Sequence, residues 1–282
     1  MDRSPFIPYD SSYDHFGKHG QELIYTTVYK IFLRLFYVFI LDILIGIVLM
    51  RLALGGKSKT NSSNNNSGIL NLFENLPGRW FLLHAFWNVG IVLGTLEDFK
   101  RTIDNPINAC DKTLEYNLAP SYLSMALHLY HCIIPWYAKS LTFQDFMHHI
   151  VFAICGLGSM SLAWSWGPGA NFAFFFLTGF PGGVDYFMLA MVKLKIMNRI
   201  TEKKLNTLIN TWCRGPGCVI SAAWTYSNYV QGIMEPPVFI VILQMILLFV
   251  NGQYYATRIA LNYQKVVTTE KLSPKRNIRK GK

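Results

Sequence analysis

The sequence predicts an all-α polytopic membrane protein with about seven transmembrane helices. Of its 282 residues, 51% are hydrophobic and only 15% are charged, whereas soluble domains carry roughly 25% charged residues. Seven stretches are apolar over roughly the 17 to 25 residues that a helix needs to cross a bilayer. The excess positive charge, +10 overall, lies mostly in short segments between or after these stretches, as is typical of membrane proteins.

The first two predicted spans are the most polar. The first carries Arg34 and Asp42, and the second is short and carries His84 and Asn88. Between them, residues 55–68 are rich in Asn, Ser and Gly, which predicts a flexible loop. The predicted spans are 31–54, 80–96, 118–138, 146–166, 171–194, 217–234 and 236–260.

The basic residues of the short loops predict one orientation. The tail after residue 263 is basic, with Glu270 as its single acid, so we expect it in the cytoplasm. Counting back two spans at a time brings Arg214, Lys139 and Arg79 to the same side. The acidic segment 97–115 falls on the opposite side, so the N-terminus is predicted outside and the C-terminus inside.

The spans divide the chain into four parts. We expect a non-cytoplasmic N-terminal segment (1–30), a first helix with its loop (31–79), a helical membrane domain (80–263) and a basic cytoplasmic tail (264–282). The final residues Arg279-Lys280-Gly281-Lys282 resemble a dibasic retrieval signal, which predicts the endoplasmic reticulum. A solvated basic tail attracted to anionic lipids is the alternative.

Two other classes of protein are disfavoured. Because the basicity follows the membrane topology, it indicates no nucleic-acid partner. The five cysteines have no CxxC spacing and an odd total, so neither a zinc cage nor a disulfide framework is indicated. They are Cys110, Cys132, Cys155, Cys213 and Cys218.

Ionisable side chains within spans are costly and usually mark a cavity, a proton relay or a ligand site. On the third span His128 and His131 are three residues apart and share a helix face. Asp145 precedes His148 and His149 by three and four residues, within reach across one turn. A carboxylate there would fix an imidazole tautomer and raise its basicity, as a general base requires. A single histidine in a membrane helix more often bonds to a neighbouring helix, but two pairs on consecutive helices indicate a site.

The fifth predicted span contains Pro181, Gly182 and Gly183 shortly before Asp185. Proline removes a backbone donor and glycine disfavours helix, so we expect the helix to break or kink here. Irregular backbone at membrane depth persists only where it is buried in protein or lines a wet cavity, so these residues are predicted to line one. Asp185 then pairs with a fourth-span histidine, caps the restarted helix, or does both.

The His148-His149 pair that opens one helix, followed by Asp185 on the next, resembles the TLC-domain family of ceramide synthases and TRAM proteins. The resemblance covers about residues 80–263 and is best over 127–195. It implies a six-helix barrel that holds an acyl chain. The synthases carry His-Asp-x-x-Asp on the next helix. Here no histidine precedes Asp185, and Met188 occupies the position of the motif's second aspartate. The resemblance therefore supports a lipid-binding barrel better than ceramide synthesis.

If the chain is an enzyme, the resemblance implies acyl transfer from a thioester, with acyl-CoA as substrate, to an amine. His148 or His149 would act as base or transient acyl acceptor, and Asp185 or Asp145 would orient it. We expect no cofactor and no bound metal, a membrane lipid or acyl chain as partner, and a homodimer as a candidate assembly. The remaining cavity-lining residues are expected to be His128, His131, Pro181, Gly182 and Gly183.

Two other functions stay open. Non-enzymatic members of the family make a lipid sensor or lipid-homeostasis protein an equal alternative. Membrane di-iron hydroxylases and desaturases also use histidine clusters, because imidazole suits iron. That class needs about eight histidines, whereas this chain has seven in total.

Overall fold

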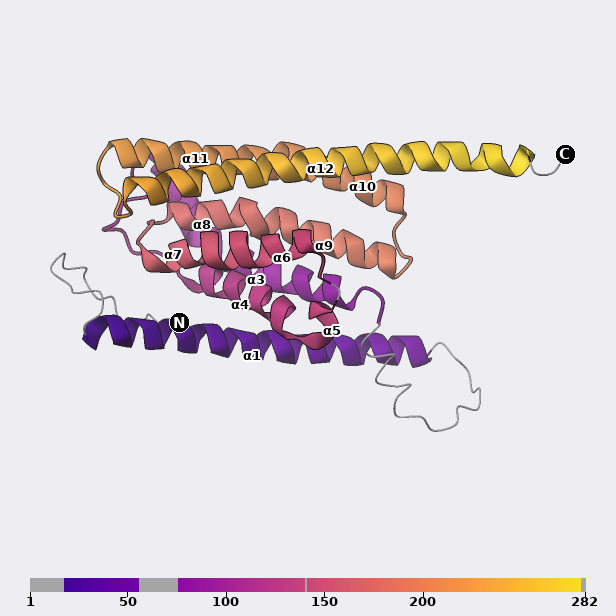
Figure 1. Cartoon of the computed structure of the whole chain (residues 1–282), viewed down its shortest axis with the longest axis horizontal. Coiled ribbons are helices and arrows are strands. Elements are labelled where there is room, and N and C mark those ends of the chain that lie inside the picture. The colour runs from indigo at the N-terminus through magenta and orange to yellow at the C-terminus, as the bar shows by residue number, and fades with distance from the viewer. Residues whose placement is uncertain (1–17, 56–75, 140, 280–282) are drawn as a thin grey trace.

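The computed structural model describes residues 18–55, 76–139 and 141–279, and these residues form helices and no strand. Helix α1 lies along one edge of the bundle and α11 and α12 along the opposite edge, with α3, α4, α8 and α9 between them (Figure 1). The α-helices are α1 (Lys18–Gly55), α3 (Arg79–Asp104), α4 (Ala119–Ile133), α5 (Pro135–Ala138), α6 (Phe143–Phe146), α7 (Ser159–Ala163), α8 (Gly169–Phe174), α9 (Phe180–Lys193), α10 (Arg199–Ile209), α11 (Gly215–Val230) and α12 (Val238–Arg279). The short 3-10 helix η1 is Pro106–Asn108, and the π-helical segments are η2 (Met147–Gly158), η3 (Phe175–Gly179) and η4 (Asn210–Arg214).

Five helical segments among the described residues are long and apolar enough to cross a membrane. They are Ile24–Ala53, Arg79–Asp104, Phe143–Ala163, Gly169–Lys193 and Val238–Glu270. The chain is therefore a multi-pass membrane protein.

The predicted spans 118–138 and 217–234 form helices that fall short of this length. Helix α4 has 15 residues, because Pro120 lies in its first turn and Pro135 follows its end. Helix α11 has 16 residues. It continues the helices α10 and η4, and this longer helical run is too polar to count as a membrane span. A total of seven spans thus stays a prediction.

Two helices extend beyond the predicted apolar stretches. The first stretch was expected from residue 31, and helix α1 begins at Lys18. The basic tail was expected from residue 264, and helix α12 continues through it to Arg279. Apolar content marks where a helix can lie in a membrane, and it does not mark where a helix ends, because polar residues also have good helix propensity. The predicted loop at 55–68 lies outside the described residues apart from its first residue.

The predicted break at Pro181 does not occur, because the helix continues from α8 through η3 into α9. A kink, the other outcome expected there, fits the irregular backbone of Gly179 (φ −58°, ψ −90°) directly before α9. One π-helical turn, Phe175–Gly179, lies directly before the proline, and such turns accommodate disturbances inside α-helices.

The glycines Gly182 and Gly183 allow close packing between helices. A Cβ atom on Gly182 would lie 3.0 Å from Nδ2 of Asn88, and one on Gly183 would lie 3.3 Å from Cβ of Asn88. Small residues let membrane helices approach closely, so these glycines bring α9 against α3.

A buried ion pair joins α1 to the rest of the bundle. Asp42 and Arg79 are 0% and 2% exposed, and two hydrogen bonds of 2.8 and 2.7 Å join their side chains. The hydroxyls of Tyr130 and Tyr137 each donate to the same carboxylate at 2.8 Å. The interior partner that Asp42 requires is therefore Arg79, at the start of α3.

Candidate functional site

Two adjoining cavities lie between α3, α4, η2, α9 and α12. The larger has a volume of about 660 Å³ and an aromatic lining that includes Trp80, Phe143 and Tyr254. The smaller has a volume of about 90 Å³ and reaches apolar side chains such as Leu127 and Leu157. Four residues line both, so the cavities share one wall: His148, Tyr186, Asn251 and Tyr255.

Five of the seven histidines gather at this wall. The ring centroids of His131 and His149 are 4.3 Å apart, and those of His84 and His131 are 6.3 Å apart. The His128 ring lies 5.6 Å from that of His148 and 5.1 Å from that of His149. This geometry is consistent with the expectation that the third-span and fourth-span histidines form one site. His84 of α3 also belongs to the cluster.

The π-helical segment η2 explains why two adjacent histidines reach the same cluster. In an α-helix with 3.6 residues per turn, neighbouring side chains diverge by about 100°. A π-helical turn is wider, so the rotation per residue is smaller. His148 and His149 lie in the first turn of η2, and both face α4.

Two histidines have their tautomers fixed by backbone carbonyl groups. Nδ1 of His128 lies 2.7 Å from the carbonyl oxygen of Ser124, and Nδ1 of His84 lies 3.1 Å from that of Trp80. A carbonyl only accepts, so each Nδ1 carries the proton and each Nε2 keeps a lone pair. In contrast, Nδ1 of His131 and Nδ1 of His149 are buried without a partner. Buried unpaired polar atoms are rare, and each calls for an explanation.

His148 contacts helix α12. The hydroxyl of Tyr255 lies 3.3 Å from Nδ1 of His148, and the guanidinium of Arg214 lies over the Tyr255 ring at 5.1 Å from its centroid. An aromatic face attracts a cation. Tyr255 therefore connects a candidate catalytic imidazole to a buried arginine.

Asp145 does not orient a histidine in this structure. Its carboxylate accepts from the backbone N–H of Thr142 at 3.0 Å and from the Thr142 hydroxyl at 2.7 Å. The hydroxyl in turn accepts from the backbone N–H of Asp145, which completes a capping box at the start of α6. Asp145 still lines the larger cavity, so it lies near the histidines without a hydrogen bond to His148 or His149.

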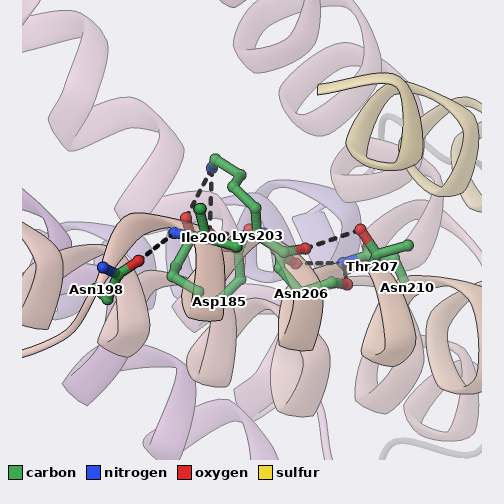
Figure 2. A network of polar contacts seen from close by, with 8 residues as sticks. Asp185, Asn198, Ile200, Lys203, Asn206, Thr207 and Asn210 are labelled. Carbon is green, nitrogen blue, oxygen red and sulfur yellow. Dashed lines mark hydrogen bonds and ion pairs between the residues drawn. The ribbon is translucent and has the colours of Figure 1, made fainter. Parts of the chain in front are cut away.

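Asp185 lines the smaller cavity but also has no histidine partner. It lies inside α9, so it does not cap that helix, and its carboxylate accepts from Nδ2 of Asn206. Asn206 accepts from Nδ2 of Asn210 at 2.6 Å, and Asn210 accepts from Nη1 of Arg214 at 2.7 Å. A hydrogen-bond chain thus connects Arg214 through two amides to Asp185, and Figure 2 shows its acidic end.

The predicted cavity-lining residues divide between the two cavities. His128 and Gly182 line the smaller and His131 the larger. Pro181 and Gly183 line neither, because the helix does not break at Pro181 and Gly183 packs against Asn88.

The sequence prediction missed the polar chain on α10 and η4. Its residues recur every four positions and are all buried, with exposed fractions of 6% or less: Glu202, Asn206, Asn210 and Arg214. This spacing places them on one helix face. This spacing was visible in the sequence, but the residues lie before the apolar stretch at 217–234 and were therefore assigned to a loop. Trp80 and Tyr255 were missed because aromatic residues near span ends usually lie at the membrane interface, and Tyr186 was missed because one aromatic residue inside a span carries no signal of its own.

Three of the histidines have the arrangement of a metal site. One ring nitrogen from each of His128, His148 and His149 lies within 4.8 Å of the others. The His128 bond to Ser124 has the form usual for metal ligands, which donate the second ring N–H to a carbonyl or carboxylate. The donor set therefore suits a metal that prefers imidazole.

Comparison of the chain with protein-family models, curated proteins and solved structures returned no significant match.

Proposed function

We propose that this chain is a TLC-type membrane protein of the endoplasmic reticulum that binds a lipid acyl chain and transfers acyl groups from a thioester to an amine. In this proposal seven helices cross the membrane, the last six form the barrel, and the C-terminus is cytoplasmic. The observation that carries the proposal is the position of His148, on the wall common to a large aromatic cavity and a narrow, partly apolar one. A reactive imidazole between two cavities suits a thioester, because the acyl part and the thiol part lie on opposite sides of the bond that is cleaved.

The histidine pair supplies the chemistry. In this proposal His148 takes the tautomer in which Nδ1–H donates to the Tyr255 hydroxyl 3.3 Å away, and the Nε2 lone pair attacks the thioester carbonyl carbon. The new N–C bond forms, the C–S bond breaks, and the Nδ1 proton of His148 passes through the Tyr255 hydroxyl to the leaving thiolate. An amine then attacks the acyl-imidazole and gives its proton to His149; the N–C bond to His148 breaks, and His149 returns the proton to the imidazole that leaves. His149 is buried and His148 is half-buried, and an acyl chain bound beside them would exclude the water that hydrolyses the intermediate.

The test uses protein in nanodiscs, incubated with an isotope-labelled acyl-CoA and then digested for mass spectrometry. We expect the acyl mass on the peptide that contains His148, and its loss on addition of a long-chain amine. His148→Ala should abolish the adduct and His149→Ala should slow its transfer. His19→Ala, at the start of α1, is the matched control and should behave as wild type. Unchanged activity in both cavity variants would remove the pair from the mechanism.

Asp185 has a supporting role in this proposal. Its negative charge balances Arg214 through the two intervening amides. Asp185→Asn keeps the shape and a hydrogen-bond acceptor but removes the charge, so we expect strongly reduced acyl transfer at neutral pH. A variant as active as wild type would reduce Asp185 to a structural residue.

A metal-dependent lipid hydroxylase or desaturase is the second candidate, favoured by the group of His128, His148 and His149. These residues would hold a single ion that activates oxygen chemistry near an acyl chain. Metal analysis of protein purified without chelators separates the two functions. The acyl-transfer proposal predicts no stoichiometric metal. Near-stoichiometric iron that is lost in His128→Ala would replace it with the second candidate.

A lipid sensor remains the non-enzymatic alternative. It predicts a bound acyl lipid in the wild-type protein with neither an acyl adduct nor a metal. The three functions therefore give different results in the same two measurements.

A further inference from the structure

We propose that Arg214 binds the carboxylate of a free fatty acid in the smaller cavity. The inference rests on the proposed acyl-chain function and adds the free acid as a ligand of the same cavity. It depends on an unusual feature of Arg214, a buried cation without a carboxylate in contact.

Arg214 has too few partners for its charge. A guanidinium carries five N–H donors, yet the hydrogen bond of Arg214 is the one from Nη1 to Oδ1 of Asn210 at 2.7 Å. Its Nε is buried without a partner, and the residue is 6% exposed. The other buried arginine of the described residues, Arg79, forms two hydrogen bonds with a carboxylate. A buried cation is costly unless it is paired.

The protein balances this charge at a distance. The chain of amides leads from Arg214 to Asp185, whose carboxylate accepts a hydrogen bond from Asn206. Glu202, in the same row, forms an ion pair of 3.0 Å with Lys203. Neither carboxylate makes an ion pair with Arg214 in the described structure. The amide chain therefore fixes the orientation of the guanidinium and leaves donors available to a ligand.

The surroundings of Arg214 suit an acyl carboxyl group. Arg214 lines the smaller cavity together with Asn251 and His148. A volume of about 90 Å³ accommodates a few atoms, as in a carboxylate, because one water needs roughly 10 to 15 Å³ on this scale. Apolar side chains such as Leu157 and Leu177 continue the same cavity. A planar guanidinium pairs well with a carboxylate.

The test compares ligands of equal shape and different charge, with protein in nanodiscs and binding measured by competition against a fluorescent fatty acid. In the wild type, oleate should bind at least about tenfold more tightly than oleamide, because a hydrogen bond to a charged group contributes that much. Arg214→Gln retains a donor for Asn210, so it should bind oleamide as before and lose the preference for oleate. Arg199→Gln, which changes an exposed arginine at the start of α10 outside both cavities, is the matched control and should keep it.

Each result has one meaning. Equal binding of oleate and oleamide by the wild type, or a preference that survives in Arg214→Gln, would overturn the assignment of Arg214 while leaving the lipid cavity intact. Failure of the wild type to bind either ligand would instead overturn the proposed function. If Arg214→Gln does not fold, Arg214→Lys replaces it. Lysine keeps the charge without the planar fork, so a weakened preference for oleate is expected and an unchanged one would contradict the proposal.

Discussion

Replacement of Asp42 by alanine should destabilise the protein strongly, because this carboxylate holds α1 against α3, α4 and α5. Asp42 is fully buried and accepts four hydrogen bonds of 2.7 to 2.8 Å, two from Arg79 and one each from Tyr130 and Tyr137. Its removal leaves the Arg79 cation buried without its carboxylate. Loss of one partner of a buried ion pair costs about 3–5 kcal/mol.

The sum of four charge-assisted bonds, at roughly 1.5–3 kcal/mol each, would be larger. We expect the smaller loss because the released hydroxyl groups find other partners within the bundle, as polar groups in membrane helices commonly do. The assay is equilibrium unfolding in mixed micelles, with the free energy of unfolding obtained from tryptophan fluorescence.

The matched control removes both charges together. The double variant Asp42→Leu/Arg79→Met leaves no buried charge, and apolar replacement of a buried ion pair is often neutral or stabilising. It should therefore recover most of the stability lost in Asp42→Ala. The reasoning is refuted if Asp42→Ala unfolds within about 1 kcal/mol of wild type, the usual range for an exposed ion pair, or if the double variant is no more stable than the single one.

Three further predictions concern packing, reactivity and orientation. Gly252→Leu should lower the free energy of unfolding by about 1–3 kcal/mol or more, because a Cβ atom there would lie 2.9 Å from Cβ of Cys218 on α11; wild-type stability would contradict this close packing. Burial raises the pKa of the Cys110 thiol to about 12, so maleimide should not label it at pH 8 until the protein unfolds, and equal labelling of the folded protein would refute its burial. Asn61 and Asn65, which lie outside the described residues in N-x-S sequons, should stay unglycosylated in a eukaryotic host; a glycan on either would reverse the predicted orientation.

The histidine cluster was partly predictable because residue spacing determines which side chains share a helix face. The separation of His128 and His131, and the neighbouring pair His148 and His149, indicated two polar faces on consecutive helices. The contribution of His84 was not predictable, because it depends on how α3 packs against α4. Helix spacing gives a face of one helix, and it does not identify the face of the partner.

The polar chain of Arg214 shows a different limit. Apolar content located the sixth span after residue 217, whereas the helical run begins at Arg199 and carries its buried polar side chains before the apolar part. Local rules also overstated the effect of Pro181, since a π-helical turn before the proline lets the helix continue. In both cases tertiary packing stabilises a helix that propensity and hydropathy alone do not predict.

The central claim is that the two adjoining cavities hold an acyl lipid beside the histidine pair. Native mass spectrometry of protein released from nanodiscs tests it most directly. We predict one acyl lipid bound per chain in the wild type. Met147→Trp, which fills the cavity next to His148, should remove the lipid, whereas the control Ile133→Trp, at a 60% exposed position of α4, should retain it. A wild-type protein without bound lipid, or a lipid that persists equally in Met147→Trp, would contradict the claim.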